Sequence, residues 1–137
     1  RQIEIILFKK KENTEIELTV EGSPRLVNAD KLHFTNVIGN LLDNAVKYST
    51  HTAHIRIKIE YNKSILISVK DRGIGIAKEH LTKIFDNLYR VPTGNIHNVK
   101  GFGLGLSYVK AICDAHQWNL SVKSEEQKGS EFIIEIK

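Results

Sequence analysis

Three asparagines, Asn36, Asn40 and Asn44, recur at every fourth position within residues 30–48. On a helix these side chains would lie one above the other in a single column. Asparagine forms helices less readily than alanine, by up to about 0.7 kcal/mol per site, so it is an unusual choice for a merely solvated face. A neutral amide can offer oxygen to a hard cation, or hydrogen bonds to a polar ligand. The column is consistent with a ligand site or with a solvated face, and by itself it does not decide between them.

A glycine-containing segment follows an apolar alternating run. Asp71 ends the run, and Gly73 and Gly75 come directly after it. Glycine lets the backbone turn sharply and approach a planar ligand closely, and a carboxylate there can accept a hydrogen bond from an exocyclic amine. Taken alone, the motif favours an ordinary Asp-X-Gly turn.

A second glycine cluster is more informative. Gly101, Gly103 and Gly105 alternate directly before a stretch with helical periodicity. Such a helix start exposes backbone N–H groups at its positive end, where phosphate binds readily. No parallel strand leads into the motif and no Gly-Lys-Ser/Thr follows it, so it is neither a dinucleotide-binding fingerprint nor a P-loop.

Hydrophobic periodicity predicts the elements that must position these groups. Asp30 stands where a helix N-cap is expected. Strands are predicted for 3–8, 15–20, 53–60, 64–70, 118–124 and 131–136, and helices for 30–48, 78–84 and 104–116. The first two strands should form a hairpin. Because the strands come in adjacent pairs, we expect an α/β two-layer sandwich, with a mixed, mostly antiparallel sheet of about five strands on about three helices. Residues 85–101 lack periodicity, as a lid or a disordered loop does.

Bulk properties narrow the classes of function. The 137 residues suit a single domain, 1–137, and no apolar run is long enough to span a membrane. The net charge of +4 is not concentrated, since the basic run 9–11 is followed by Glu12 and Glu15, so nucleic-acid binding is not expected. The single cysteine, Cys113, should be a buried thiol in a cytoplasmic setting. The chain starts at Arg1 without a methionine, so we expect a fragment of a longer protein.

Taken in order, the motifs resemble those of the ATP-binding domain of sensor histidine kinases, in the superfamily shared with gyrase B, Hsp90 and MutL. Residues 40–49 resemble the N box, 71–76 the first glycine box, 84–91 the F box and 101–106 the second glycine box; Gly129 and Ser130 then enter the last strand. The resemblance covers nearly the whole chain. It implies a Bergerat-type sandwich that holds ATP between its helices under a mobile lid, 87–102.

The resemblance also implies roles for individual residues. Asn44 should be the Mg²⁺ ligand, Asn40 should contact the metal or the phosphates, and Lys47 should reach phosphate; these three form the expected catalytic set. Tyr48 should lie beside the nucleotide, and Asp71 should accept the adenine amino group. Further nucleotide contacts are expected from the glycine boxes and the lid: Gly73, Gly75, Ile76, Arg90, Lys100, Gly101, Gly103, Leu104, Gly105 and Leu106. Which of Arg90 and Lys100 contacts the phosphates is left open.

The implied function is a histidine kinase that binds Mg-ATP and passes the γ-phosphate to a histidine. None of the six histidines lies in an acceptor-like context, so the acceptor should belong to a separate dimerisation domain of the same protein. Asn40 stands where ATPase relatives carry an acid, and an amide cannot serve as a base, so hydrolysis should be poor. Expected partners are that histidine phosphotransfer domain, within a homodimer, and a response regulator. The setting is the cytoplasmic part of an inner-membrane sensor, without direct membrane contact by this domain. The alternative is a degenerate nucleotide-binding or partner-docking module without kinase activity.

Two positions depart from the family pattern. Leu88 stands where the family often has phenylalanine, and Gln117-Trp118 follows His116 where the family often has a glycine pair. Neither position is an expected ligand contact.

Overall fold

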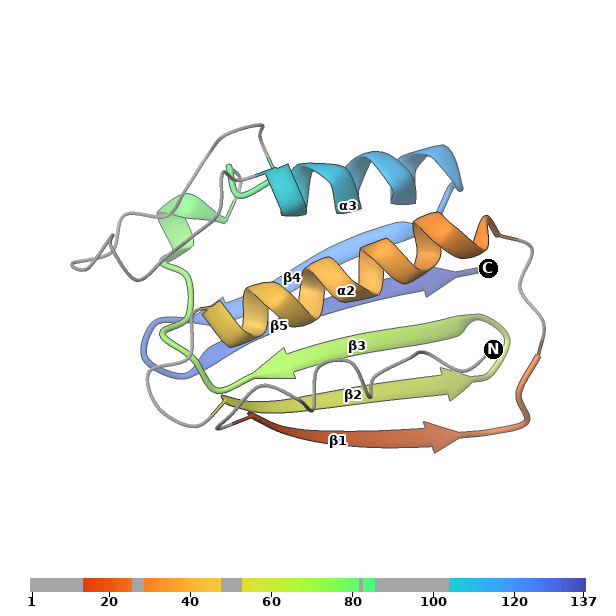
Figure 1. The fold of residues 1–137 in the computed structure, drawn as a ribbon, viewed down its shortest axis with the longest axis horizontal. Helices are drawn as coiled ribbons and strands as arrows, with labels where there is room; N and C mark the ends of the chain where they lie inside the picture. The colour runs from red at the N-terminus through yellow and green to blue at the C-terminus, as the bar shows by residue number, and fades with distance from the viewer. Residues whose placement is uncertain (1–13, 26–28, 48–52, 82, 86–103) are drawn as a thin grey trace.

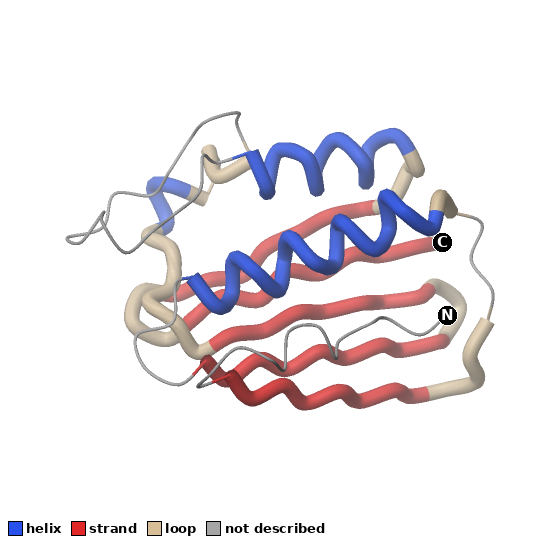
Figure 2. Tube along the Cα trace, viewed as in Figure 1, coloured by secondary structure: helices blue, strands red, loops and turns tan. Residues whose placement is uncertain are grey.

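The computed structural model describes residues 14–25, 29–47, 53–81, 83–85 and 104–137. Within them, two α-helices cover one face of a five-stranded sheet (Figures 1 and 2). The elements are β1 (Thr14–Glu21), α2 (Lys31–Lys47), β2 (Ala53–Tyr61), β3 (Ile65–Asp71), the 3-10 helix η1 (Lys78–His80), α3 (Leu104–Ala115), β4 (Asn119–Glu125) and β5 (Gly129–Ile136). The predicted α/β two-layer sandwich is confirmed, with two α-helices among the described residues where about three were expected.

The sheet has the strand order β1-β2-β3-β5-β4. β1 and β2 are parallel, because α2 crosses between them, whereas β2–β3, β3–β5 and β4–β5 are antiparallel. The predicted mixed, mostly antiparallel sheet is therefore confirmed. The hairpin predicted between 3–8 and 15–20 cannot be followed, since 1–13 lie outside the described residues.

The core lies between the sheet and the two helices. Alternate residues of β2 and β3, such as Ile57 and Val69, are buried in register with each other. The apolar stripe of α2 packs onto them as its periodicity predicted, through Val37, Ile38, Leu41, Leu42 and Ala45.

Local hydrogen bonds close the start of α2 and the end of α3. At the start of α2, the backbone N–H of His33 donates to Oδ1 of Asp30 at 3.0 Å, so the predicted N-cap is confirmed. At the end of α3, the N–H of Trp118 donates to the carbonyl of Cys113 at 2.8 Å, and the N–H of Gln117 donates to that of Asp114 at 3.1 Å. This pair of bonds is a Schellman motif, and Gln117 adopts the left-handed φ of 61° that the motif requires.

The helix predicted for 78–84 is shorter in the structure. The N–H of His80 donates to the carbonyl of Ala77 and the N–H of Lys83 to that of His80, both at 2.9 Å, so the bonds span three residues. Turns continue to Phe85, which meets Phe132 edge to face at 6.2 Å between ring centroids. The segment is too short to propagate an α-helix, and its apolar end instead anchors it to the core.

Candidate functional site

The elements that carry the described members of the predicted site end or begin near one end of the domain. Figure 1 shows the end of α2, the end of β3, the turn between β4 and β5 and the start of α3 together on the left. The C-terminus lies at the opposite end. The predicted lid, 87–102, lies outside the described residues, as do Tyr48, Arg90, Lys100, Gly101 and Gly103.

Asp71, the last residue of β3, is a buried carboxyl group with 4% of its surface exposed. Its Oδ1 accepts hydrogen bonds from the backbone N–H groups of Gly73, at 2.8 Å, and Ser130, at 3.2 Å. Within the part of the chain that the structure describes, no donor contacts Oδ2. One carboxylate oxygen is thus fixed by the backbone, and the other is left as an acceptor.

The electrostatics of Asp71 favour a ligand that donates a hydrogen bond. Burial raises the pKa of Asp71 above its usual value, and the bonds from Gly73 and Ser130 oppose this shift only in part. A buried charged oxygen without a partner costs free energy. A ligand N–H bonded to Oδ2 would lower that cost.

The loop after β3 lies directly on the turn between β4 and β5. Gly75 has a φ of 73°, and a Cβ there would lie 2.1 Å from the carbonyl oxygen of Glu125. Gly129 has a φ of 111°, and a Cβ there would lie 2.1 Å from the carbonyl oxygen of Asp71. Both positions therefore require glycine, and the close approach fixes the loop next to the carboxylate.

Helices α2 and α3 come close to each other where Asn40 faces Gly105. A Cβ on Gly105 would lie 3.3 Å from Oδ1 of Asn40. The structure therefore brings together an N-box amide and the second glycine box, two motifs far apart in the sequence. Helix α3 begins at Leu104. Gly105 has no side chain that would press on the Asn40 amide, and Leu106 packs against the core.

The other polar residues of α2 have different surroundings. The Asn44 side chain is half-buried, and no hydrogen bond to it occurs among the described residues. Nζ of Lys47 forms an ion pair with Asp43, at 3.0 Å. Nδ2 of Asn36 donates to the Tyr108 hydroxyl at 3.4 Å on α3. Among the described residues, Asn40 and Asn44 are thus the members of the column whose side-chain amides make no hydrogen bond.

Two other predicted contacts occupy the loop after β3. Gly73 is buried and contributes its N–H to Asp71. Ile76 is 9% exposed and belongs to the core, so its side chain anchors the loop to the core. The sequence pattern gave no role to Ser130, because a backbone donor can belong to any residue type; its only signal was the Gly129-Ser130 step into the last strand.

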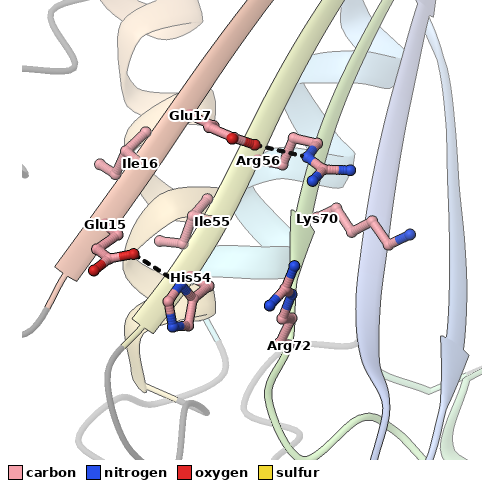
Figure 3. A pocket seen from close by; sticks show the side chains of 8 residues that line it. All are labelled: Glu15, Ile16, Glu17, His54, Ile55, Arg56, Lys70 and Arg72. Atoms are coloured by element: carbon pink, nitrogen blue, oxygen red, sulfur yellow. Dashed lines mark hydrogen bonds and ion pairs between the residues drawn. The ribbon is translucent and has the colours of Figure 1, made fainter.

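A hollow on the other face of the sheet is separate from this site (Figure 3). Lys70 and Arg72 line it, and their side chains alternate with that of the buried Asp71. Its remaining lining residues are Glu15, Ile16, Glu17, His54, Ile55 and Arg56. Glu17 forms an ion pair with Arg56 at 3.0 Å, and Oε1 of Glu15 lies 3.0 Å from Nδ1 of His54. These charges form a solvated outer face.

The described residues hold neither a side-chain cluster suited to a metal ion nor a membrane-spanning helix. They contain no group of three or more His, Cys, Asp or Glu side chains that could hold a metal ion. None of their helices has the length and apolar character needed to cross a membrane.

Comparison with known proteins defines the class. Residues 29–137 match the family described as "Histidine kinase-, DNA gyrase B-, and HSP90-like ATPase", and the chain belongs to this family. The resemblance to the ATP-binding catalytic domain of a sensor histidine kinase is confirmed.

Individual relatives are sensor kinases. Sensor protein RprX of Bacteroides fragilis is 46% identical over 127 residues, which are 90% of this chain and 24% of RprX. Sensor histidine kinase WalK of Bacillus subtilis is 35% identical, over 88% of this chain and 20% of WalK. The chain thus spans a quarter or less of the length of these relatives.

Solved structures agree with the fold. The catalytic domain of histidine kinase ThkA has a TM-score of 0.78 and 29% identity, over 96% of this chain and 87% of that domain. Full-length ShkA, solved in complex with AMPPNP, has a TM-score of 0.74 and 25% identity, over 90% of this chain and 25% of ShkA.

Proposed function

We propose that this domain binds Mg-ATP at the end of the sandwich where Asp71 and Asn40 lie. The domain then donates the γ-phosphate to a histidine of the dimerisation domain, in two-component signalling. The buried Asp71 carboxylate carries the proposal. Its Oδ1 is held by two backbone N–H groups, so Oδ2 is presented in a fixed direction to the exocyclic amine of adenine. The AMPPNP complex of ShkA supports a nucleotide site in this fold.

The phosphate end of the proposed site lies between α2 and the start of α3. Asn40 and Asn44 offer amide oxygens, which are hard donors, and Gly105 leaves space beside Asn40. Mg²⁺ usually takes only one or two protein ligands and completes its shell with water and phosphate oxygens, so two amides suit it. The bound ion would offset negative charge on the phosphates.

Transfer rather than hydrolysis follows from the residue types in the site. Phosphoryl transfer depends mainly on positioning and electrostatic stabilisation. The amide of Asn40 orients oxygen ligands but cannot take a proton from water. Lys47 pairs with Asp43, and the remaining N–H donors of its ammonium group can bond to phosphate. The acceptor histidine is supplied by the dimerisation domain.

Calorimetric titration with an ATP analogue and Mg²⁺ tests the site. We expect the unchanged domain to bind, chelation of Mg²⁺ to weaken binding, and Asp71→Asn to lose about 10- to 100-fold in affinity, the range for a hydrogen bond to a charged group. Asp114→Asn is the matched control, because that carboxylate is exposed and pairs with Lys110 on α3.

Equal affinity of the Asp71→Asn variant and the unchanged domain would overturn the adenine role. A folded, unchanged domain that binds no nucleotide would instead favour a docking module without kinase activity.

A further inference from the structure

The hydroxyl group of Ser124, near the end of β4, makes three hydrogen-bond contacts. The backbone N–H of Ile76 donates to its Oγ at 2.7 Å, and the hydroxyl donates to the carbonyl oxygen of Gly129 at 3.0 Å. The Oγ of Ser130 lies 2.7 Å away. Because the single Ser124 proton is used on Gly129, the Ser130 hydroxyl is the donor in the third contact. All bonding positions of the Ser124 oxygen are therefore occupied.

These contacts join the two segments that hold the Asp71 carboxylate. Ile76 ends the loop that starts with Asp71 and contains the donor Gly73. On the other side, Ser130 supplies the second N–H to Asp71. Ser124 itself makes no hydrogen bond to either carboxylate oxygen, so we expect any effect it has on Asp71 to pass through these neighbouring segments.

A further hydrogen bond ties the same loop to the same turn. The N–H of Gln127 donates to the carbonyl oxygen of Ile74 at 2.7 Å, on the same turn between β4 and β5. Without the Ser124 hydroxyl, the Ile76 N–H and the Gly129 carbonyl would need other partners in a half-buried place. A shift of the backbone, or entry of water, would supply those partners and would turn the carboxylate.

We propose that Ser124 is a positioning residue for base recognition: it fixes the direction of Asp71 Oδ2 and so sets the preference for a base with an amine over one with a carbonyl at that point. This inference rests on the proposed function, because Asp71 must be the group that meets the base. A carbonyl facing a carboxylate leaves two acceptors opposed, so discrimination depends on how firmly the carboxylate is held.

The test compares binding of ATP with binding of inosine triphosphate, whose base carries a carbonyl in place of the amine. In Ser124→Ala, we expect ATP affinity to fall about tenfold, as a small misplacement of a recognition group can cause, while inosine triphosphate affinity changes little. Ser124→Thr keeps the hydroxyl and should keep the preference. Ser121→Ala is the matched control, because Ser121 is exposed on the same strand.

A second readout does not need nucleotide. Hydrogen exchange of the Ile76 amide should be faster in Ser124→Ala than in the Ser121→Ala control, because that amide loses its acceptor. Should Ser124→Ala fail to fold, Ser124→Cys offers a weaker acceptor of similar shape and should show an intermediate preference.

The outcomes separate the two proposals. An unchanged domain that binds neither nucleotide overturns the proposed function. An unchanged domain that prefers ATP, with a Ser124→Ala variant that keeps the same ratio or loses both affinities equally, overturns only the role of Ser124. Unchanged exchange of the Ile76 amide overturns it as well.

Discussion

At the residue scale, Asp71 combines burial with charge. The carboxyl group lies almost out of contact with solvent, and burial raises its pKa, while two backbone N–H groups still bond to one oxygen. An asparagine at this position keeps an oxygen acceptor for those two donors and removes the buried charge. A buried charge at Asp71 therefore costs the empty domain stability, and the proposed ligand role would account for that cost.

The first prediction concerns Asp71→Asn and pH. The pKa of Asp71 in the folded state lies above its unfolded value of 3.8. Protonation of Asp71 therefore favours the folded state: this contribution to stability is fully present below pH 3.8 and is lost as pH rises through the folded-state pKa. The variant should therefore equal or exceed the unchanged domain in free energy of unfolding at pH 7, with a difference that shrinks as pH falls. Urea titrations across pH measure this. A variant that is markedly less stable at pH 7 contradicts it.

The second prediction concerns Cys113, which is buried as its position in the helical pattern indicated. Burial and the nearby Asp114 raise the pKa of the thiol to about 11, although Lys110 opposes the shift. At pH 8 only about one thiol in a thousand would be ionised, even if reagents could reach it. Maleimide labelling should be slow in the folded domain and fast in denaturant. Rapid, complete labelling of the folded domain would refute this.

Residue types in the sequence pointed to part of the candidate site. Asp71 and Asn40 stand out because a carboxylate before glycines and an amide column are chemically unusual. The contribution of Ser130 could not be found in this way, since its N–H is independent of residue type and depends on β3 and β5 being neighbours. Contacts of Tyr48 and Arg90 stay predictions, because both residues lie outside the described ranges.

At the element scale, the end of α3 links the two helices. The side chain of Trp118 is buried, stacks on His116 at 4.4 Å between centroids and meets Phe34 of α2 edge to face at 5.9 Å. Gln117 must therefore turn the chain tightly to place Trp118. The family often has glycines at these two positions, and the structure shows a conformational demand for glycine only at the first.

The third prediction follows from the left-handed φ of Gln117. Residues other than glycine pay about 1–2 kcal/mol for this conformation, partly offset by the greater freedom of glycine in the unfolded chain. Gln117→Gly should raise the free energy of unfolding by about 0.5–1 kcal/mol, measured by urea titration. Gln117→Ala, which keeps a Cβ, should bring no gain. A loss of stability in the glycine variant would argue for a contact of the Gln117 side chain.

Element identity was easier to predict than element pairing. Period-two alternation gave β2, β3, β4 and β5 to within about two residues, as buried strands usually allow. The parallel pairing of β1 with β2 was not predicted, because it joins segments on either side of α2 and no local turn marks it.

At the scale of the whole molecule, we expect the proposed nucleotide site and the acceptor histidine to belong to different domains. The described site residues collect at one end of this sandwich (Figure 1), and no histidine of the sequence has an acceptor-like context. Proximity contributes up to about 7–11 kcal/mol when reactants are well oriented. Separate molecules forgo much of this gain.

The fourth prediction is that this chain does not label itself with ATP, but slowly phosphorylates the histidine-bearing domain supplied separately. The rate should depend on acceptor concentration and should be lost in Asn44→Ala, which removes a proposed metal ligand. Asn36→Ala is the control, since Asn36 is exposed on the same helix and bonds to Tyr108. Labelled ATP with and without the acceptor gives the answer. Acid-labile label on this chain alone would show that one of its own histidines accepts phosphate.

The parallel β1–β2 pair also bears on the order in which the domain assembles. β2 with β3 and β4 with β5 are adjacent in the chain and need only short turns to pair, whereas β1 must wait until the chain has passed through α2 and returned. Loops of this length close slowly, so contacts distant in sequence form late in folding. Among the described strands, β1 lies at one edge of the sheet and pairs only with β2, just as β4 lies at the other edge and pairs only with β5. The contact between Asp71 and Ser130 spans 59 residues and needs β3 to pair with β5, so we expect the Asp71 loop and the turn that holds it to come together late as well.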